Sequence, residues 1–330
     1  MFDNAKIFIT GGTGSWGQCL TTYLLKTNVK EIIIYSRNEL SHVTMKEKFN
    51  DERLTFIIGD VRNVERLIEA SKEVDYIFHL AALKHVPICE EQPYEAILTN
   101  IIGTVNVIKA AITNKVKKVI NVSSDKAVSP NNLYGLTKAI GEKLIIEANN
   151  KKSQTKFICV RAGNVIGSNG SVIPLFINQI KKNNLITITD INMTRFFITL
   201  DEAIKLLIKA SQFSYGGEIL IMKMTSMKIN DLAQILIKYY GNEKTVVNYS
   251  KIRLGEKINE ELVSVNEARN TYQLDDDYYL IITPMMYDKL KPKYANLKKV
   301  TFNSYNSSTD LLSIKQIKQR LKQANFIDGR

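Results

Sequence analysis

The glycine-rich segment TGGTGSWG at residues 10–17 constrains the fold of this chain more than any other feature. It follows a short apolar run, Lys6–Thr10, and precedes a helical pattern. Strand, glycine-rich turn and helix in this order form the fingerprint of a dinucleotide-binding βαβ unit, with the helix N-terminus facing the phosphates. Glycines here permit a tight turn, a close approach of backbone to pyrophosphate and close helix–strand packing. The segment therefore predicts a dinucleotide site at Gly11, Thr13, Gly14, Ser15, Trp16 and Gly17.

Short runs rich in Ile and Val alternate with longer helical patterns through the first half of the chain. Such runs, bounded by Gly, Asp or Ser, are typical of buried parallel strands. Their regular alternation with helices predicts an α/β fold with a Rossmann-type, doubly wound parallel sheet. The predicted strands are Lys6–Thr10, Glu31–Tyr35, Leu54–Ile58, Tyr76–Leu80, Val116–Val122, Lys156–Val160 and Glu218–Met222. The predicted helices between them are Gly17–Thr27, Val64–Lys72, Tyr94–Asn114 and Leu133–Asn149.

The alternation fades after about residue 165, which predicts a second, smaller unit. We expect residues 1–166 to form the dinucleotide-binding domain, with segments near 190–222 returning to it. Thr199–Glu202 fits a capping box at the start of a helix in that returning part. Residues 167–189 and 223–330 are expected to form a C-terminal α/β substrate lobe and tail, with helices near 173–182, 229–240 and 311–324.

The end of the second predicted strand indicates which dinucleotide is bound. NAD enzymes usually place a carboxylate there to hold the ribose hydroxyls. This chain has Ser36 and Arg37 instead, which suit a 2′-phosphate and favour NADP. Further cofactor contacts are expected after the third and fourth strands, from Asp60, Val61, Ala81 and Ala82.

A second group of polar residues follows the fifth predicted strand. Ser123-Ser124-Asp125-Lys126 comes directly after it, where ligands bind in such sheets. Tyr134 and Lys138 follow at a spacing of four, which places both on one face of a helix. An ammonium group beside a phenol lowers the phenol's pKa, so Tyr134 and Lys138 are predicted to take a hydroxyl proton while hydride moves to a nicotinamide.

Composition excludes several other classes. The net charge of +12 comes from lysines scattered along the chain, without a basic block or an RNA-binding signature, so no nucleic-acid partner is expected. No apolar run approaches the length of a membrane span and no signal peptide is evident, so a cytoplasmic protein without a membrane partner is expected. Three distant cysteines and the absence of ligand spacing predict neither disulfides nor a metal site. His79 is expected to lie in the sheet and His85 in a cleft loop.

The fingerprint and the Tyr134–Lys138 pair resemble the extended short-chain dehydrogenase/reductase superfamily. More specifically, several segments resemble the inverting UDP-N-acetylglucosamine 4,6-dehydratases of pseudaminic-acid and capsule pathways. These segments are YSRNE (35–39), GDVR (59–62), AALKHVP (81–87), SSDKAVSPNNLYGLTK (123–138), RAGNVIGSNGSVIP (161–174), MTRFF (193–197) and RLGEK (253–257).

The resemblance implies a lyase whose tightly bound NADP is regenerated in each cycle. In this reaction Tyr134 deprotonates the 4-hydroxyl, Lys126 as a neutral amine removes the proton on carbon 5, and Asp125 protonates the departing 6-hydroxyl. Ser124 holds the 4-oxygen, and the product is UDP-2-acetamido-2,6-dideoxy-L-arabino-hex-4-ulose. The substrate-binding residues it implies are Lys84, Asn164, Arg195, Arg253 and Glu256.

The resemblance also implies a homo-oligomer, a dimer or a hexamer, paired through helices 94–114 and 133–149. A UDP-sugar 4-epimerase or reductase, or a retaining 4,6-dehydratase, remains an alternative on the same scaffold. Epimerases need only the Tyr–Lys pair, and retaining dehydratases carry Asp–Glu where this chain has Asp125–Lys126. A non-catalytic NADP-binding regulator is a further alternative, although such proteins tend to lose the tyrosine that this chain keeps as Tyr134.

Overall fold

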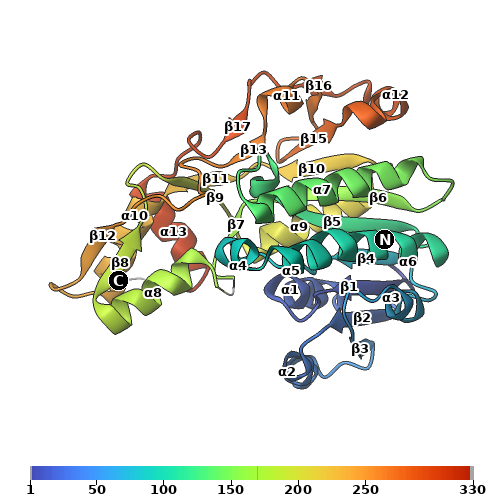
Figure 1. The fold of residues 1–330 in the computed structure, drawn as a ribbon, viewed down its shortest axis with the longest axis horizontal. Helices are drawn as coiled ribbons and strands as arrows, with labels where there is room; N and C mark the ends of the chain where they lie inside the picture. The colour runs from blue at the N-terminus through green and yellow to red at the C-terminus, as the bar shows by residue number, and fades with distance from the viewer. Residues whose placement is uncertain (1, 169, 328–330) are drawn as a thin grey trace.

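The computed structural model of the chain describes residues 2–168 and 170–327 (Figure 1). Its centre is a ten-stranded sheet with the strand order β16-β14-β15-β10-β6-β5-β4-β1-β2-β3. All neighbouring strands from β3 to β10 are parallel. These strands are β1 (Lys6–Thr10), β2 (Glu31–Ser36), β3 (Leu54–Ile58), β4 (Tyr76–His79), β5 (Lys118–Ser124), β6 (Lys156–Ala162) and β10 (Glu218–Met222). The predicted Rossmann-type parallel sheet is confirmed.

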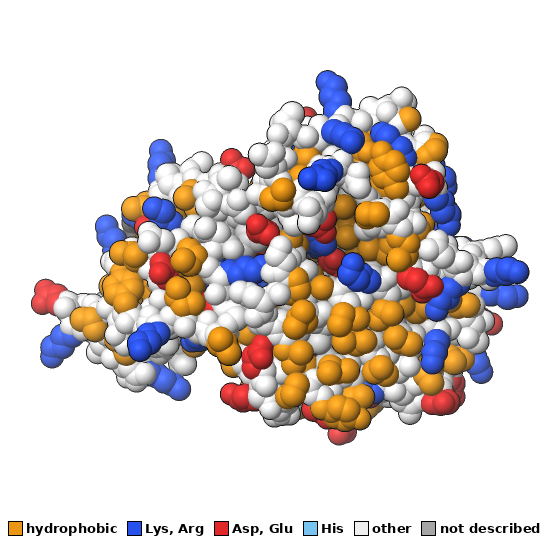
Figure 2. Space-filling view, turned by 45° about the horizontal axis from the view of Figure 1, so that its top comes forward, with side chains coloured by type: hydrophobic (Ala, Val, Ile, Leu, Met, Phe, Trp, Pro, Cys, Tyr) orange, Lys and Arg blue, Asp and Glu red, His pale blue; other side chains and the backbone are white. Residues whose placement is uncertain are grey.

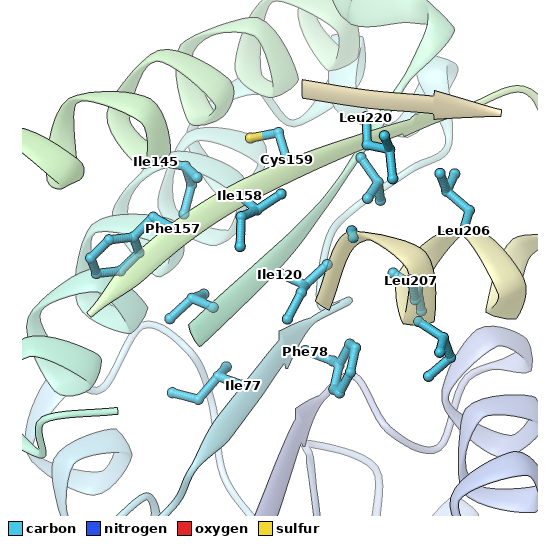
Figure 3. Close-up of a cluster of buried hydrophobic side chains, with 14 of the residues drawn as sticks. Ile77, Phe78, Ile120, Ile145, Phe157, Ile158, Cys159, Leu206, Leu207 and Leu220 are labelled. Atoms are coloured by element: carbon cyan, nitrogen blue, oxygen red, sulfur yellow. The ribbon is translucent and has the colours of Figure 1, made fainter. Parts of the chain in front are cut away.

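Helices cover both faces of this sheet, as a doubly wound fold requires. Helices α1 (Ser15–Leu24) and α9 (Leu200–Phe213) pack together on one face, while α3 (Val64–Ala70), α6 (Gly103–Thr113) and α7 (Leu133–Glu147) cover the other. Figure 3 shows the core between them, where Ile158 and Ile120 lie between Ile145 of α7 and Leu207 of α9. Helix α9 begins with the predicted capping box of Thr199 and Glu202.

Other helices were not predicted. α2 (Glu39–Phe49) is capped by Asn38 and carries few apolar residues, and α4 (Val86–Glu91) is a short helix beside the cleft described below.

One helical rod on the second face is long and apolar. Helix α5 (Pro93–Ile97), a π-helical turn (Leu98–Ile102) and α6 follow one another without a break. The rod spans 21 residues, Pro93–Thr113, and contains an 18-residue window with a mean hydropathy of 1.5, so it is long and apolar enough to cross a membrane. This corrects the expectation that no run reaches such a length. However, 56% of that window is buried inside the protein, against α3, α7 and β4, as in a core helix.

The structure also corrects the predicted domain division near the C-terminus. Strands β14 (Thr271–Gln273), β15 (Tyr278–Ile282) and β16 (Lys298–Lys299) belong to the main sheet, not to the substrate lobe. β15 pairs antiparallel with β10 along its whole length, from Glu218 opposite Ile282 to Met222 opposite Tyr278. This pairing satisfies the edge of β10, which would otherwise be open.

The second lobe has a core of its own. Side chains such as Ile173, Phe176, Leu232, Leu236 and Leu321 form this separate buried cluster. Its helices are α8 (Val172–Asn183), α10 (Ile229–Tyr240) and α13 (Ile314–Gln323). Its strands are β7 (Asn164–Val165), β8 (Leu185–Ile188), β9 (Thr194–Ile198), β11 (Thr225–Lys228) and β12 (Val246–Tyr249). The connecting elements are β13 (Glu261–Val263), α11 (Val265–Ala268), α12 (Tyr287–Leu290) and β17 (Tyr305–Asn306).

Candidate active site

A cleft of about 950 Å³ lies at the carboxyl ends of the parallel strands, next to the second lobe. This is where ligands bind in open α/β sheets. Every residue that the sequence singled out for a site lines this cleft except Gly17. Residues from the glycine turn, four strand ends, α7 and the second lobe thus meet around one volume.

The glycine turn is built as a cradle for a ligand. Gly11 has φ +66°, and a Cβ atom there would lie 2.9 Å from the backbone of Ala81. A Cβ atom on Gly17 would lie 2.2 Å from the carbonyl oxygen of Gly12, so the start of α1 packs directly on the turn. Gly14 is the N-cap of α1 and offers no side-chain cap. The first N–H groups of α1 can therefore bind a phosphate.

The end of β2 brings a hydroxyl and a cation to the cleft wall. The hydroxyl of Ser36 contacts Thr13 Oγ1 at 3.0 Å and His42 Nε2 at 2.8 Å. Arg37 is half-exposed, and its guanidinium lies 3.8 Å from a carboxylate oxygen of Asp60. Although burial alone would raise the pKa of Asp60, hydrogen bonds from Arg62 lower it, so Asp60 is ionised and partly balances Arg37.

Tyr134 and Lys138 lie on the first turns of α7 and face the cleft. Burial raises the pKa of Tyr134 to about 12, and the charge of Lys126 and a hydrogen bond with Ser124 offset only part of this. Burial also lowers the pKa of Lys138 to about 8. The expectation that Lys138 lowers the phenol's pKa is therefore wrong for the protein alone, since the cation that acts on Tyr134 is Lys126.

Ser124, Asp125 and Lys126 form a tight hydrogen-bonded group at the end of β5. The Ser124 hydroxyl donates to Asp125 Oδ1 at 2.7 Å, and Lys126 Nζ donates to the same oxygen at 3.1 Å. Asp125 is buried, and its second oxygen has no hydrogen-bond partner among the described residues. A carboxyl and an amine thus lie side by side on the cleft wall, as an acid and a base acting on neighbouring atoms would require.

The pKa of Lys126 is shifted in the direction opposite to the one expected from the sequence. Burial acts to lower its pKa, but the carboxylates of Asp125 and Glu260 outweigh burial, and the net effect raises the pKa of Lys126. A lysine with a lowered pKa was predicted. In the protein alone Lys126 is therefore an ammonium ion, because two carboxylates face it.

Glu260 is a cleft residue that the sequence analysis missed. Its Oε1 lies 3.5 Å from Lys126 Nζ and 3.8 Å from Arg195 Nε, and its side chain is 4% exposed. No motif marks this position, which precedes β13 and comes 134 residues after Lys126 in the chain. Only the fold brings the two side chains together.

The predicted substrate-binding residues all line the cleft, but they differ in exposure and in the contacts that they make within the protein. Arg253 is exposed on the loop before Glu256. Arg195 is buried: one nitrogen donates to the carbonyls of Thr194 and Ile258, and another lies 3.7 Å from Glu256 Oε1. Arg195 thus anchors the loop as well as facing the cleft. Lys84 and Asn164 also face the cleft, and burial lowers the pKa of Lys84.

The histidines take the places that the sequence indicated. His79 lies in the sheet between Thr10 and Thr104, and burial lowers its pKa to about 3. His85 lines the cleft at the N-cap of α4. Within residues 2–168 and 170–327, no group of three His, Cys, Asp or Glu side chains is placed to hold a metal ion.

Both the sequence and the fold are similar to those of known proteins. Residues 7–282 match the family described as polysaccharide biosynthesis protein. The chain is 45% identical over 285 residues to the inverting UDP-N-acetylglucosamine 4,6-dehydratase of Campylobacter jejuni serotype O:2, with 85% of this chain and 84% of the relative covered. It is 41% identical over 335 residues to a UDP-glucose 4-epimerase of Rickettsia bellii, with 99% and 98% covered. The crystal structure of Pen from Bacillus thuringiensis matches with a TM-score of 0.93 at 40% identity, with 99% of this chain and 100% of that chain covered.

Proposed function

The chain belongs to the polysaccharide biosynthesis protein family, a branch of the extended short-chain dehydrogenases that contains dehydratases and epimerases, and from this premise we propose that it is a UDP-N-acetylglucosamine 4,6-dehydratase that inverts carbon 5. The observation that carries the proposal is the pair Asp125–Lys126 beside Tyr134 in one cleft. Its product would be UDP-2-acetamido-2,6-dideoxy-L-arabino-hex-4-ulose.

Each side chain has a task that follows from its place. Tyr134 takes the proton of the substrate's 4-hydroxyl. The hydroxyl of Ser124, which is hydrogen-bonded to Tyr134, holds the substrate's 4-oxygen. A ketone at carbon 4 then acidifies the proton on carbon 5, which Lys126 removes. Asp125 delivers a proton to the departing 6-hydroxyl from its neighbouring position. General acid–base help of this kind contributes about 10²–10⁴ in rate.

A nicotinamide cofactor fits the remaining part of the cleft and, when bound, would supply the hydride acceptor and donor that these side chains lack. We propose NADP as this cofactor. Gly11, Gly14 and the N-terminus of α1 would hold its pyrophosphate, and Ser36 and Arg37 its 2′-phosphate. The absence of a carboxylate at the end of β2 supports NADP over NAD.

The substrate would lie across the lobe boundary. Arg253, Arg195 and Lys84 would bind its diphosphate through charge-assisted hydrogen bonds, with Asn164 and Glu256 beside the sugar. Such a placement leaves carbons 4, 5 and 6 facing Tyr134, Lys126 and Asp125.

The direct test is to incubate the pure protein with UDP-N-acetylglucosamine in deuterated water and to analyse the product by NMR. We expect a 4-keto-6-deoxy sugar with the L-arabino configuration and deuterium at carbon 5. A product without deuterium at carbon 5, or with the D-xylo configuration, would contradict the assignment of Lys126 as the inverting base.

A 4-epimerase is the second candidate, because relatives that match 99% of this chain are named UDP-glucose 4-epimerase. Epimerisation requires only oxidation and reduction at carbon 4, for which Tyr134 and Lys138 suffice. The same NMR experiment separates the two, because an epimerase returns a sugar that keeps its 6-hydroxyl and has the opposite configuration at carbon 4.

We further propose a cytoplasmic homo-oligomer, a dimer or a hexamer. Figure 2 shows hydrophobic side chains gathered in one broad area of the surface, where α5, α6 and α7 lie in Figure 1. Exposed residues of α4, α5, the π turn and α7 form an apolar surface that a second copy would cover; they are Ile88, Tyr94, Ile97, Ile102, Leu136 and Ile140. Sedimentation of the wild type and of a Tyr94→Lys variant tests this.

A further inference from the structure

His42 is a buried histidine that the proposed function does not use. It lies on α2, is 5% exposed and does not itself line the cleft. Its Nε2 lies 2.8 Å from the hydroxyl oxygen of Ser36 and 3.1 Å from the carbonyl oxygen of the same residue. Its other ring nitrogen, Nδ1, is buried and has no hydrogen-bond partner among the described residues. The ring therefore acts on the end of β2, where Ser36 and Arg37 line the cleft.

These contacts assign a hydrogen of the ring to Nε2. A carbonyl oxygen can only accept a hydrogen bond, so the ring nitrogen beside the Ser36 carbonyl must carry a hydrogen. A hydrogen on Nδ1 alone would leave a buried N–H without an acceptor, which is costly, and would place two lone pairs against each other at Nε2. Nε2 is therefore a donor toward Ser36, and the Ser36 hydroxyl cannot donate to His42.

Packing holds the ring in this orientation. The His42 ring lies edge-on to Phe56 of β3, with ring centroids 5.7 Å apart and an interplanar angle of 77°. The helix that carries His42 is capped by Asn38, whose side chain accepts from the N–H of Ser41 at 2.8 Å. The imidazole therefore has a fixed place beside the end of β2.

The direction of this hydrogen bond decides what the neighbouring hydroxyls can offer. Ser36 Oγ lies 3.0 Å from Thr13 Oγ1, and both residues line the cleft. The two hydroxyls have two hydrogens, of which one is used between them. Because His42 does not accept the other, one hydrogen of the pair remains to donate toward the cleft. If Nε2 accepted instead, Thr13 would donate to Ser36 and Ser36 to His42, and the pair would have no hydrogen left.

A pair of hydroxyls that donates suits a phosphate better than a ribose hydroxyl. The oxygens of an ionised 2′-phosphate only accept hydrogen bonds. A ribose 2′-hydroxyl also needs an acceptor for its own hydrogen, which NAD enzymes supply as a carboxylate. Arg37 follows Ser36 in the chain and brings a cation to the same cleft. A phosphate at this place would therefore meet both a donor and a positive charge.

We propose that His42 is a positioning residue for NADP: by donating from Nε2 to Ser36, it keeps the Thr13–Ser36 pair a donor toward the cleft and so favours a phosphorylated ribose. No covalent bond is made or broken in this role, and His42 itself would touch no ligand. The inference rests on the proposed cofactor and deepens it, because it assigns part of the selectivity for NADP to a residue behind the site.

The test measures the binding of NADP and of NAD to the nucleotide-free, full-length protein by calorimetry. His42→Phe keeps an aromatic ring beside Phe56 but cannot donate, so the Ser36 hydroxyl loses its fixed direction. We expect it to weaken NADP binding by about two- to tenfold, the effect of one hydrogen bond, and to leave NAD binding nearly unchanged. His42→Gln, whose amide N–H can donate to Ser36, should restore most of the NADP affinity.

A double-mutant cycle shows whether His42 acts through Ser36. In a Ser36→Ala background the hydroxyl is absent, so His42→Phe should cause no further loss of NADP affinity. A role in packing α2 alone would give the same loss with and without the hydroxyl. Met45→Ala is the matched control, because Met45 is buried on the same helix and makes none of these hydrogen bonds. Its ratio of NADP to NAD affinity should stay at the wild-type value.

An unchanged ratio of NADP to NAD affinity in His42→Phe would overturn the role of His42, as would an equal loss in the Ser36→Ala background. In both cases a wild-type preference for NADP would leave the proposed cofactor standing. If the wild type binds NAD as tightly as NADP, the proposed cofactor itself fails and the role of His42 fails with it, and this is seen before any variant is compared.

Discussion

Asp125→Asn is the substitution that separates elimination from oxidation. Asp125 is buried, and its Oδ1 accepts hydrogen bonds from Ser124 at 2.7 Å and Lys126 at 3.1 Å. An asparagine has nearly the same shape and keeps one oxygen for these two bonds. What it removes is the proton that the carboxylic acid would deliver to the departing 6-hydroxyl.

The size of the effect follows from this single loss. Removing a positioned general acid costs about 10²–10⁴ in rate, or about 3–5 kcal/mol at about 1.4 kcal/mol for each factor of ten. The effect on the base has the opposite sign. Asp125 raises the pKa of Lys126, so its loss makes the neutral amine easier to form. A slow elimination in Asp125→Asn is therefore attributable to the missing acid and not to a poorer base.

Oxidation at carbon 4 should survive, because it depends on Tyr134 and not on Asp125. On rapid mixing of Asp125→Asn with UDP-N-acetylglucosamine, bound reduced cofactor should accumulate and give absorbance in the near ultraviolet. Tyr134→Phe is the control and should give no such signal, because its first step fails. The opposite pattern, with Tyr134→Phe reducing the cofactor and Asp125→Asn inert, would refute the assignment of roles.

Three further substitutions test other parts of the structure. Arg37→Ala should weaken NADP binding far more than NAD binding in calorimetry, and equal wild-type affinities for both cofactors would contradict the proposed preference. Arg161→Met removes the ion-pair partner of the buried Glu142 and the partly buried Glu267. In a denaturant titration it should lower the free energy of unfolding by about 3–5 kcal/mol, whereas a loss below about 1 kcal/mol would show that the ion pairs add little. Burial lowers the pKa of Lys138 from 10.5 to about 8, so between these pH values the unfolded state binds more protons than the folded state. The free energy of unfolding of the wild type should therefore rise there by up to about 1.4 kcal/mol per pH unit relative to that of Lys138→Met. Parallel curves of unfolding free energy against pH would refute the shift.

The parallel part of the fold was predictable because its signal is local. β1, β3 and β10 have the predicted bounds, since each is a short apolar run bounded by turn residues. β14 and β15 were not predicted, although Tyr278–Ile282 is an apolar run of the same kind. β15 takes its place by pairing with β10, more than 50 residues earlier in the chain, and β14 by pairing with β15. The Asp-rich turn between β14 and β15 does not signal a hairpin in the sequence.

The candidate site divides in the same way. Tyr134 and Lys138 are recognised by their spacing on a single helix, and the glycine turn by its place between strand and helix. Glu260 has no such signature, because its partners Lys126 and Arg195 come from different elements. The pKa of Lys126 was for this reason expected in the wrong direction, since burial was anticipated but the second carboxylate was not.

The division of labour within the cleft explains how one scaffold suits relatives with different names. Under the proposed function, the glycine turn, Tyr134 and Lys138 would serve oxidation and reduction at carbon 4, which dehydratases and epimerases share. What distinguishes the reactions must act on carbons 5 and 6, and in this chain the groups beside Tyr134 that can do so are Asp125 and Lys126 at the end of β5. Glu260 lies beside this pair, 3.5 Å from Lys126 Nζ, and its backbone N–H donates to Ser307 Oγ. Under the proposed function, the end of β5 would therefore supply the groups that distinguish the dehydratase reaction, while the glycine turn and α7 would supply the chemistry that it shares with epimerisation.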